Sequence, residues 1–378
     1  MNEKENLLDL IEDAKAVSSK SFSEIAFNEV DALAFAQLSY FKFDILGLNS
    51  PDDRLSFKKI DEMDFECPAS AKARTKCHYE LLKTMSESER YGDFFVTDYY
   101  TISSETEEKQ FCGVTFVCDS FIYVAFRGTD ATIVGWKEDA NLSFLNQVPA
   151  QAESVKYLED VANKHKRKPI LVGGHSKGGN LAIYACSYAP KSVRKRLKQI
   201  YSFDGPGFRD EFFEKSDYEK IEHLVYKLVP YSSIIGLLLE NRGNCNICDS
   251  KTYSIFQHNP YKWLIKDHKF VPKSHLNPSS VYFDASLKRW LSDISDENRK
   301  KFFDFVFLFF EKAEITDFYS RKRNLAKIIK NLPTIISAYT ALDEQTKIFV
   351  KKTVGKLISI VKEEKKKFED ENDEESDE

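Results

Sequence analysis

The stretch LVGGHSKGGNL, residues 171–181, decides the fold of this chain. It completes a short apolar run that starts at Lys168, and it contains Gly-His-Ser-Lys-Gly, a match to the G-x-S-x-G pattern. A nucleophile elbow needs a strand, a serine in a sharp turn and then a helix, with small residues where backbones approach closely. The run 168–173, the glycines and a helix from Lys177 to about Tyr188 supply these parts. The stretch therefore predicts that Ser176 is a nucleophile, the alternative being a structural glycine turn.

Segments on both sides of the elbow predict strands and helices in alternation. Such an order is typical of a mostly parallel sheet covered by helices. We therefore expect an α/β-hydrolase-like fold. The predicted elements are a hairpin of strands at 111–118 and 121–126, helices at 27–46, 151–165 and 177–188, and strands at 168–173, 199–203 and 223–229.

Beyond about residue 285 the strand patterns stop and helical spacing takes over. Ser295 is a suitable N-cap, followed by acidic residues in the first turn. The Phe-rich run 302–310 is apolar on most faces, so we expect it to be buried. The last ten residues carry eight acidic side chains and no basic one, a composition typical of a solvated tail. The predicted domains are a leader (1–24), a hydrolase domain (25–290), a helical C-terminal extension (291–366) and a disordered acidic tail (367–378).

Composition narrows the class of protein. The chain is 42% hydrophobic and 30% charged, as in an ordinary globular protein. It has neither a signal-peptide pattern nor a run of eighteen apolar residues, and its seven cysteines are scattered, so we expect reduced thiols and a cytoplasmic location. No basic stripe interleaved with aromatics supports nucleic-acid binding. Cys245 and Cys248 form a lone C-x-x-C pair without a partner motif, so neither a metal nor a cofactor is expected.

A serine nucleophile needs a base, and histidine is the usual one. Four histidines follow Ser176 in the sequence, and in this fold the base lies late in the domain. His258, in Ile255-Phe-Gln-His-Asn-Pro-Tyr-Lys-Trp263, is bracketed by apolar residues that would hold a loop in place. We therefore predict His258 as the base, with an ordinary loop histidine as the alternative. The other three are His223, His268 and His275.

Several motifs together resemble known families. The pattern FRGTD (126–130), then Trp136 and Asp139, then GHSKGGNLA is similar to the fungal-type class 3 lipases. The motifs FNEVDALAFAQLSY, VAFRGTD, HSKGGNLA, FDGPGF, SSIIGLLLE and QHNPYKW more closely resemble the bacterial Mbeg-like family of α/β-hydrolase-like proteins. This likeness covers roughly residues 25–290.

The resemblance implies an oxyanion hole made by Thr129 and the backbone N–H of Lys177. Two donors from separate loops, aimed at one oxygen, are the geometry that acyl transfer needs. Thr129 could equally cap a turn at a strand end. The segment 130–148 would be a lid with Trp136 as an apolar anchor, or else a plain crossover helix.

The sequence departs from the lipase pattern at the acid. Lipases of this type carry an aspartate after the strand that here reads LVYKLVP, where Ser233 stands instead. Asp204, in FDGPGF, is an alternative acid that could reach His258 from the neighbouring strand. It could also accept local backbone N–H groups in a Gly-Pro turn. A site served by Asp204, one helped by Ser233 and a site without activity all stay open.

These features predict a serine hydrolase. The expected reaction cleaves an ester or thioester through an acyl-enzyme on Ser176, with a lipid or other acyl ester as substrate on the strength of the resemblance. The alternative is a catalytically inert hydrolase fold that serves as a binding or scaffold module. The substituted acid position, the helical extension and the acidic tail support that alternative, and the sequence names no protein partner for the extension.

Overall fold

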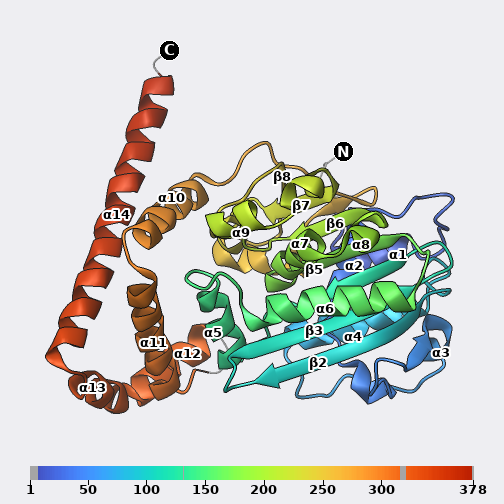
Figure 1. Ribbon diagram of the computed structural model, residues 1–378, viewed down its shortest axis with the longest axis horizontal. Coiled ribbons are helices and arrows are strands. Elements are labelled where there is room, and N and C mark those ends of the chain that lie inside the picture. Colours follow the sequence, from blue (N-terminus) through green and yellow to red (C-terminus); the bar gives the residue numbers. More distant parts are fainter. Residues whose placement is uncertain (1–6, 131, 316–320, 377–378) are drawn as a thin grey trace. The chain divides into compact units, whose positions relative to one another are not determined.

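A computed structural model describes residues 7–130, 132–315 and 321–376 of the chain (Figure 1). The chain divides into two compact units. The first comprises residues 1–102, 111–128 and 150–277, and the second comprises residues 103–110, 129–149 and 278–378.

An eight-stranded sheet forms the framework, and its strands follow one another in sequence order from β1 to β8. The pairs β1–β2 and β3–β4 are antiparallel, whereas all pairs from β4 to β8 are parallel. The bounds are β1 Arg54–Ser56, β2 Phe95–Ser104, β3 Lys109–Val117, β4 Ile122–Phe126, β5 Ile170–His175, β6 Leu197–Phe203, β7 Val225–Pro230 and β8 Cys245–Cys248. A second, two-stranded sheet pairs β9 (Ile265–Lys266) with β10 (Lys269–Phe270).

Strand β4 shows why the sheet is covered on both faces. All five of its residues are buried. Successive side chains of a strand point to opposite faces, and here Tyr123 joins one hydrophobic cluster while Val124 joins the other. Because the side chains on both faces of β4 are buried, a layer of helices has to cover each face of the sheet.

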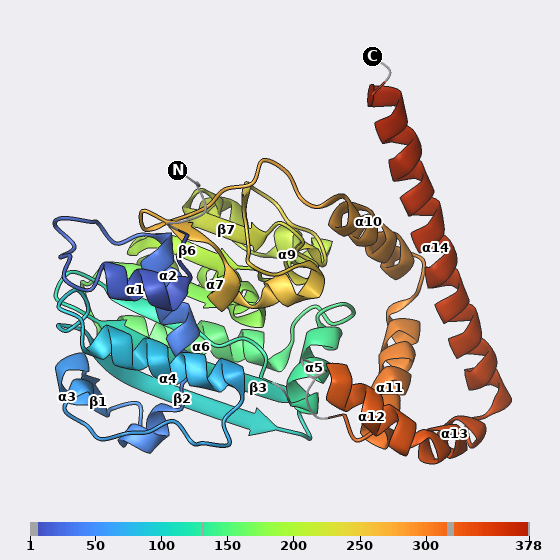
Figure 2. The same ribbon diagram turned by 180° about the vertical axis from the view of Figure 1, so that it is seen from behind.

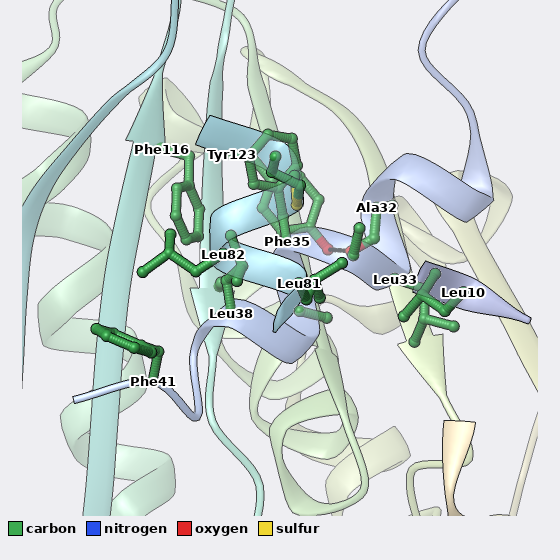
Figure 3. Packing of buried hydrophobic residues seen from close by; sticks show 14 of the residues in the cluster. Leu10, Ala32, Leu33, Phe35, Leu38, Phe41, Leu81, Leu82, Phe116 and Tyr123 are labelled. Atoms are coloured by element: carbon green, nitrogen blue, oxygen red, sulfur yellow. Dashed lines mark hydrogen bonds between the residues drawn. The ribbon is translucent and has the colours of Figure 1, made fainter. Parts of the chain in front are cut away.

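Helices form these two layers in the first unit. Helices α1 (Leu10–Ala16), α2 (Glu29–Leu38) and α4 (Ala73–Ser86) lie on the face nearest the viewer in Figure 2. Helices α6 (Pro149–Lys164), α7 (Lys177–Tyr188) and α8 (Lys191–Arg194) lie on the face shown in Figure 1. Phe35 of α2 packs against Phe116 and Tyr123 of the sheet (Figure 3). Two further short α-helices of this unit are α3 (Phe57–Asp61) and α9 (Asp210–Lys215).

The second unit is helical apart from the strand ends at 103–110. Its helices are α5 (Ile133–Asn141), α10 (Pro278–Ser292), α11 (Asp296–Lys312), α12 (Arg321–Lys330), α13 (Leu332–Thr340) and α14 (Glu344–Ser376). The buried Trp290 of α10 donates its indole N–H to the carbonyl oxygen of Thr353 in α14, at 3.3 Å. The segment predicted as a lid or crossover helix contains α5, which packs against α11. In the turn after α5, the ring of Phe144 stacks on the ring of Phe303 of α11.

The elements agree closely with the sequence prediction. The mostly parallel sheet flanked by helices and the C-terminal helical region are confirmed, and Ser295 caps α11 as expected. Within the expected helical region, α12 and α13 are separate helices, because Pro333 cannot continue a helix. The expected helix 27–46 ends at Leu38 and is followed by a short 3₁₀ turn.

Two expectations for the C-terminal region differ from the structure. In α11 only Phe307 is buried, so the prediction that the whole Phe-rich run is buried is wrong. Helix α14 continues to Ser376, beyond residue 367, where a disordered tail was predicted. Glu and Lys are strong helix formers, and the acidic composition masks that propensity. Residues 377–378 of the predicted tail, like residues 1–6 of the predicted leader, lie outside the described residues.

Candidate active site

Ser176 occupies a sharp turn between the sheet and a helix. Strand β5 ends at His175, and α7 begins at Lys177. The backbone of Ser176 has φ 59° and ψ −133°, a conformation that residues other than glycine rarely adopt. Backbone strain of this kind persists only where the surroundings enforce it, and it concentrates at functional sites. The turn therefore has the conformation that the G-x-S-x-G pattern predicts.

The glycines of the elbow are required by close backbone contacts. A Cβ placed on Gly174 would lie 2.3 Å from the backbone carbon of Gly178. A Cβ on Gly178 would lie 2.1 Å from the carbonyl oxygen of Phe126 at the end of β4. Any larger side chain would push the turn away from the neighbouring strand. The glycines thus let Ser176 sit directly above the ends of β4 and β5.

Three of the predicted site residues form one hydrogen-bond chain. His258 Nε2 lies 3.0 Å from Ser176 Oγ, and His258 Nδ1 lies 2.6 Å from Asp204 Oδ2. A carboxylate only accepts, so Nδ1 carries the hydrogen and Nε2 accepts from the serine hydroxyl. Asp204 is fully buried, whereas Ser176 and His258 retain 8% and 7% exposure. This hydrogen-bond chain thus runs from the fully buried carboxylate of Asp204 to the hydroxyl of Ser176, a residue that keeps a small exposed fraction.

Asp204 and Ser233, the two alternatives for the acid position, contact each other. Asp204 follows β6 and turns toward the site with φ 49°. Its Oδ1 accepts hydrogen bonds from the hydroxyl of Ser233 (2.5 Å) and from the backbone N–H of Gly236 (3.1 Å). The carboxylate therefore faces His258 through one oxygen, and the other is held by the loop after β7. Ser233 supports the carboxylate and makes no direct contact with His258 among the hydrogen bonds of the described residues.

The loop that carries His258 is held by its own neighbours. His258 ends a short 3₁₀ turn, Ser254–His258. The indole N–H of the fully buried Trp263 donates to the carbonyl oxygen of Gln257 at 2.7 Å. The side-chain amide of Gln257 accepts from the backbone of Ser232 (2.6 Å) and donates to that of Thr252 (2.7 Å). The motif QHNPYKW thus fixes the histidine through buried aromatic and amide groups.

His175, the residue before the nucleophile, also touches the backbone of His258. Its Nε2 donates to the His258 carbonyl oxygen at 2.9 Å, which leaves Nδ1 as an acceptor. Tyr40 Oη (3.2 Å) and Arg74 Nη2 (3.4 Å) approach Nδ1. Burial, then the charges of His258 and Arg74, hold the pKa of His175 well below its ordinary value, so it is neutral. The sequence alone indicated no role for His175, Tyr40 or Arg74. His175 nevertheless lies within the elbow motif, and Tyr40 is the last residue of the motif FNEVDALAFAQLSY.

The remaining histidine candidates lie elsewhere. His268 is buried between Asp13 (2.7 Å) and Asp31 (3.3 Å). His223 is exposed in a 3₁₀ turn, and His275 is exposed in a loop. Among the hydrogen bonds of the described residues, none joins His223, His268 or His275 to Ser176, so the geometry favours His258 as the base.

The two predicted oxyanion-hole residues belong to different units. Thr129 lies in the second unit, where its hydroxyl donates to Asp139 Oδ2 at 2.6 Å. Lys177 lies in the first unit and opens α7 directly after the nucleophile. The N-terminus of a helix carries a partial positive charge, which suits a developing oxyanion. The assignment of both residues to an oxyanion hole stays a prediction.

No metal centre is formed by the part of the chain that the structure describes. There, no group of three or more His, Cys, Asp or Glu side chains is placed to hold a metal ion. Cys245 and Cys248 are both free thiols at the two ends of β8.

The model of the Mbeg1-like family matches residues 85–308, which include the serine, the histidine and the aspartate of the hydrogen-bond chain. The chain belongs to the Mbeg1-like family. No curated protein matches it. The family membership agrees with the resemblance that the motifs indicated.

Solved structures with a similar fold are fungal lipases. The Rhizomucor miehei lipase in complex with its propeptide is 16% identical, with 58% of this chain and 67% of that chain covered and a TM-score of 0.36. Lipase II from Rhizopus niveus is 15% identical over 57% of this chain and 77% of its own, also with a TM-score of 0.36. Lip2 lipase from Yarrowia lipolytica is 12% identical over 67% and 87%, with a TM-score of 0.33. At these values the likeness says nothing about activity or substrate.

Proposed function

We propose that this member of the Mbeg1-like family is a serine hydrolase that cleaves a carboxylic ester or thioester through an acyl-enzyme on Ser176. The observation that supports the proposal most is the continuous hydrogen-bond chain from Asp204 through His258 to the Ser176 hydroxyl. A serine next to a histidine, with a third group that orients the histidine, is the arrangement that activates a weak nucleophile.

Acylation follows from this arrangement. The Ser176 oxygen attacks the carbonyl carbon of the substrate, and its hydrogen passes to His258 Nε2. The resulting imidazolium is stabilised by the buried carboxylate of Asp204, 2.6 Å from Nδ1. When the tetrahedral intermediate collapses, the bond to the leaving alcohol or thiol breaks and His258 returns the proton to it. An acyl-enzyme and the free alcohol or thiol result.

Deacylation repeats the same proton transfers with water. His258 Nε2 takes a proton from a water molecule as its oxygen attacks the acyl carbon. The second tetrahedral intermediate then releases the carboxylic acid, and the proton on His258 restores the Ser176 hydroxyl. Each cycle consumes one ester or thioester and one water, and no electron leaves the site. The reaction therefore requires no cofactor.

Stabilisation of the oxyanion completes the proposal. We assign the backbone N–H of Lys177, at the start of α7, as a donor to the oxyanion. Removal of one oxyanion donor typically costs about 10²–10³ in kcat.

The substrate class is a lipid or other acyl ester. This part of the proposal rests on the similarity of the FRGTD and GHSKGGNLA motifs to class 3 lipases. A short p-nitrophenyl ester is a suitable first probe because its acyl group makes few demands on pocket length.

Covalent labelling tests the proposal directly. A fluorophosphonate probe should label the wild-type protein and leave Ser176→Ala unlabelled, because only an activated serine reacts. Ser232→Ala is a matched control, since Ser232 is another buried serine in the same unit. Wild type that neither reacts with the probe nor hydrolyses p-nitrophenyl butyrate would indicate an inert hydrolase fold. That alternative drew support from the serine at position 233, and the contact of Asp204 with His258 weakens this argument.

A further inference from the structure

Helices α12, α13 and α14 expose large apolar side chains. Among the described residues, fifteen large hydrophobic side chains are exposed, and eight of them lie between residues 325 and 358. Their exposed fractions range from 38% to 66%. Groups of large apolar side chains that are exposed to solvent often mark an interaction site. We name these eight residues the α12–α14 surface: Leu325, Ile329, Leu332, Ile336, Tyr339, Ile348, Val354 and Ile358.

The spacing of these residues gathers them on helix faces. Leu325 and Ile329 are four residues apart in α12 and are 58% and 66% exposed. Leu332, Ile336 and Tyr339 are spaced four and three residues apart in α13. Residues at these intervals lie on one side of a helix. Helices α12 and α13 therefore each present an exposed apolar face.

An apolar groove lies between α11 and α13. It has a volume of about 390 Å³. Phe305 of α11 meets Tyr339 of α13 edge to face across it, with ring centroids 6.4 Å apart. Lys312 is the one charged residue of its lining. The partial exposure of the Phe-rich helix is thus part of the same apolar feature. The apolar lining is Phe305, Leu308, Phe309, Ile335, Ile336, Ala338 and Tyr339.

Positive charge is interleaved with this apolar surface. Residues 321–362 contain ten Lys and Arg and only two acidic residues, Asp343 and Glu344. Lys351 and Lys352 are exposed on α14. Exposed ion pairs join Lys330 to Glu314, Lys347 to Glu344 and Lys356 to Asp293, but such pairs are weak in water. Positive charge therefore predominates beside the apolar side chains between residues 321 and 362, whereas residues 363–378, which include the C-terminal part of α14, contain ten acidic and three basic residues.

This combination fits the surface of an anionic lipid bilayer. Basic side chains bind lipid headgroups while apolar side chains enter the acyl region. A nucleic acid would use the lysines but leave the leucines and isoleucines unsatisfied. Among the described residues, no helix is long and apolar enough to cross a membrane.

We propose that the α12–α14 surface docks the protein on an anionic membrane, with its apolar side chains below the headgroups and the neighbouring lysines at the lipid phosphates. The proposal stands on the second unit alone and does not depend on the reaction assigned to Ser176.

Vesicle sedimentation tests it with the full chain. Vesicles of phosphatidylcholine alone are compared with vesicles that contain about three parts in ten of phosphatidylglycerol, at low and at high NaCl. We expect at least about ten-fold more protein on the anionic vesicles, and a large loss of binding at high salt. Equal binding to both vesicle types, or binding that salt does not change, would overturn the electrostatic part. Absence of binding to either would overturn the proposal.

Matched variants locate the surface. Ile329→Ser and Lys351→Glu should each lower binding several-fold. Ile45→Ser and Lys166→Glu change exposed side chains of the first unit in the same way and should bind as wild type. A dimer that Ile329→Ser converts to monomer in light scattering, with no vesicle effect, would instead identify a second copy as the partner. Ser176→Ala should bind vesicles normally, so loss of hydrolysis and loss of docking are separate results.

Discussion

Ser233 donates its hydroxyl hydrogen to Asp204 Oδ1 at 2.5 Å, and the other oxygen of the same carboxylate lies 2.6 Å from His258 Nδ1. The residue at the expected acid position and the residue that fills the role are thus in direct contact. Strands β6 and β7 are parallel neighbours, so the segments that follow them meet at one edge of the sheet. An acid on the end of β6 can therefore reach the same histidine as an acid after β7.

This contact predicts that Ser233→Asp lowers activity. A second carboxylate beside the buried Asp204 would raise the pKa of one of the pair, because two like charges at this distance cannot both ionise readily. We expect hydrolysis of p-nitrophenyl butyrate to fall by about ten-fold or more. Ser233→Ala, which removes one hydrogen bond to a charged group, should cause a loss of up to about ten-fold. An increase of activity in Ser233→Asp would mean that the acid belongs at 233, and the Asp204 assignment would then be wrong.

Asp204→Asn should retain the fold and lower kcat by about 10⁴-fold. The amide would favour the wrong tautomer of His258 and would not stabilise its charged form. Asp98→Asn is a suitable control, because Asp98 is buried and lies 2.8 Å from His165 in a second Asp–His pair. Far-ultraviolet circular dichroism and steady-state kinetics on both variants separate the two effects. Similar kcat values for Asp204→Asn and wild type would contradict the proposed mechanism.

His175→Leu should lower kcat with little change in KM. It removes the hydrogen bond to the His258 carbonyl oxygen, so the imidazole would sample positions away from the serine. The loss of one buried hydrogen bond corresponds to about 1 kcal/mol, or roughly five-fold in rate. His175→Gln keeps a donor and should recover part of the loss, a rescue that a purely steric role for the ring would not produce. Unchanged kcat in His175→Leu would remove this residue from the positioning of His258.

The elbow and the individual strands next to it were predictable because their signals are local. Ser176 is recognised from the glycines and the apolar strand within eleven residues, and φ 59° at the serine agrees with that pattern. His258 was inferable because its aromatic neighbours, such as Trp263, lie within the same short motif. Each of these signals is contained in one continuous stretch, so spacing alone carries the information.

Contacts between segments that lie far apart in the chain could not be predicted from the sequence. Tyr40 and Arg74 approach His175 across 135 and 101 residues of chain, and spacing says nothing about such a meeting. The choice between Asp204 and Ser233 stayed open for the same reason, since it depends on which strands are neighbours. The Phe-rich helix α11 was misjudged because an apolar sequence shows a need for burial but not what covers it.

The buried ion network around His268 predicts that stability falls at high pH. Burial alone would lower the pKa of His268, but hydrogen bonds to Asp13 and Asp31 and their charges raise it to about 9. The protonated form is therefore stabilised in the folded state, relative to an unfolded histidine with a pKa of about 6.5. Since the folded pKa is the higher one, this stabilisation is complete below about pH 6.5 and is lost as the pH rises through about 9. We expect the Tm of the wild type to decrease between pH 7 and pH 10.

His268→Gln should have a lower Tm at pH 6 and a smaller decrease of Tm toward high pH, because the charged hydrogen-bond partner is absent throughout. His275→Gln changes an exposed histidine and should follow the wild-type curve. Differential scanning calorimetry at pH 6, 8 and 10 on the three proteins measures the effect. If His268→Gln and wild type lost the same Tm over this range, the pH dependence would arise from other groups. The His268 network would then not be the source of the alkaline instability.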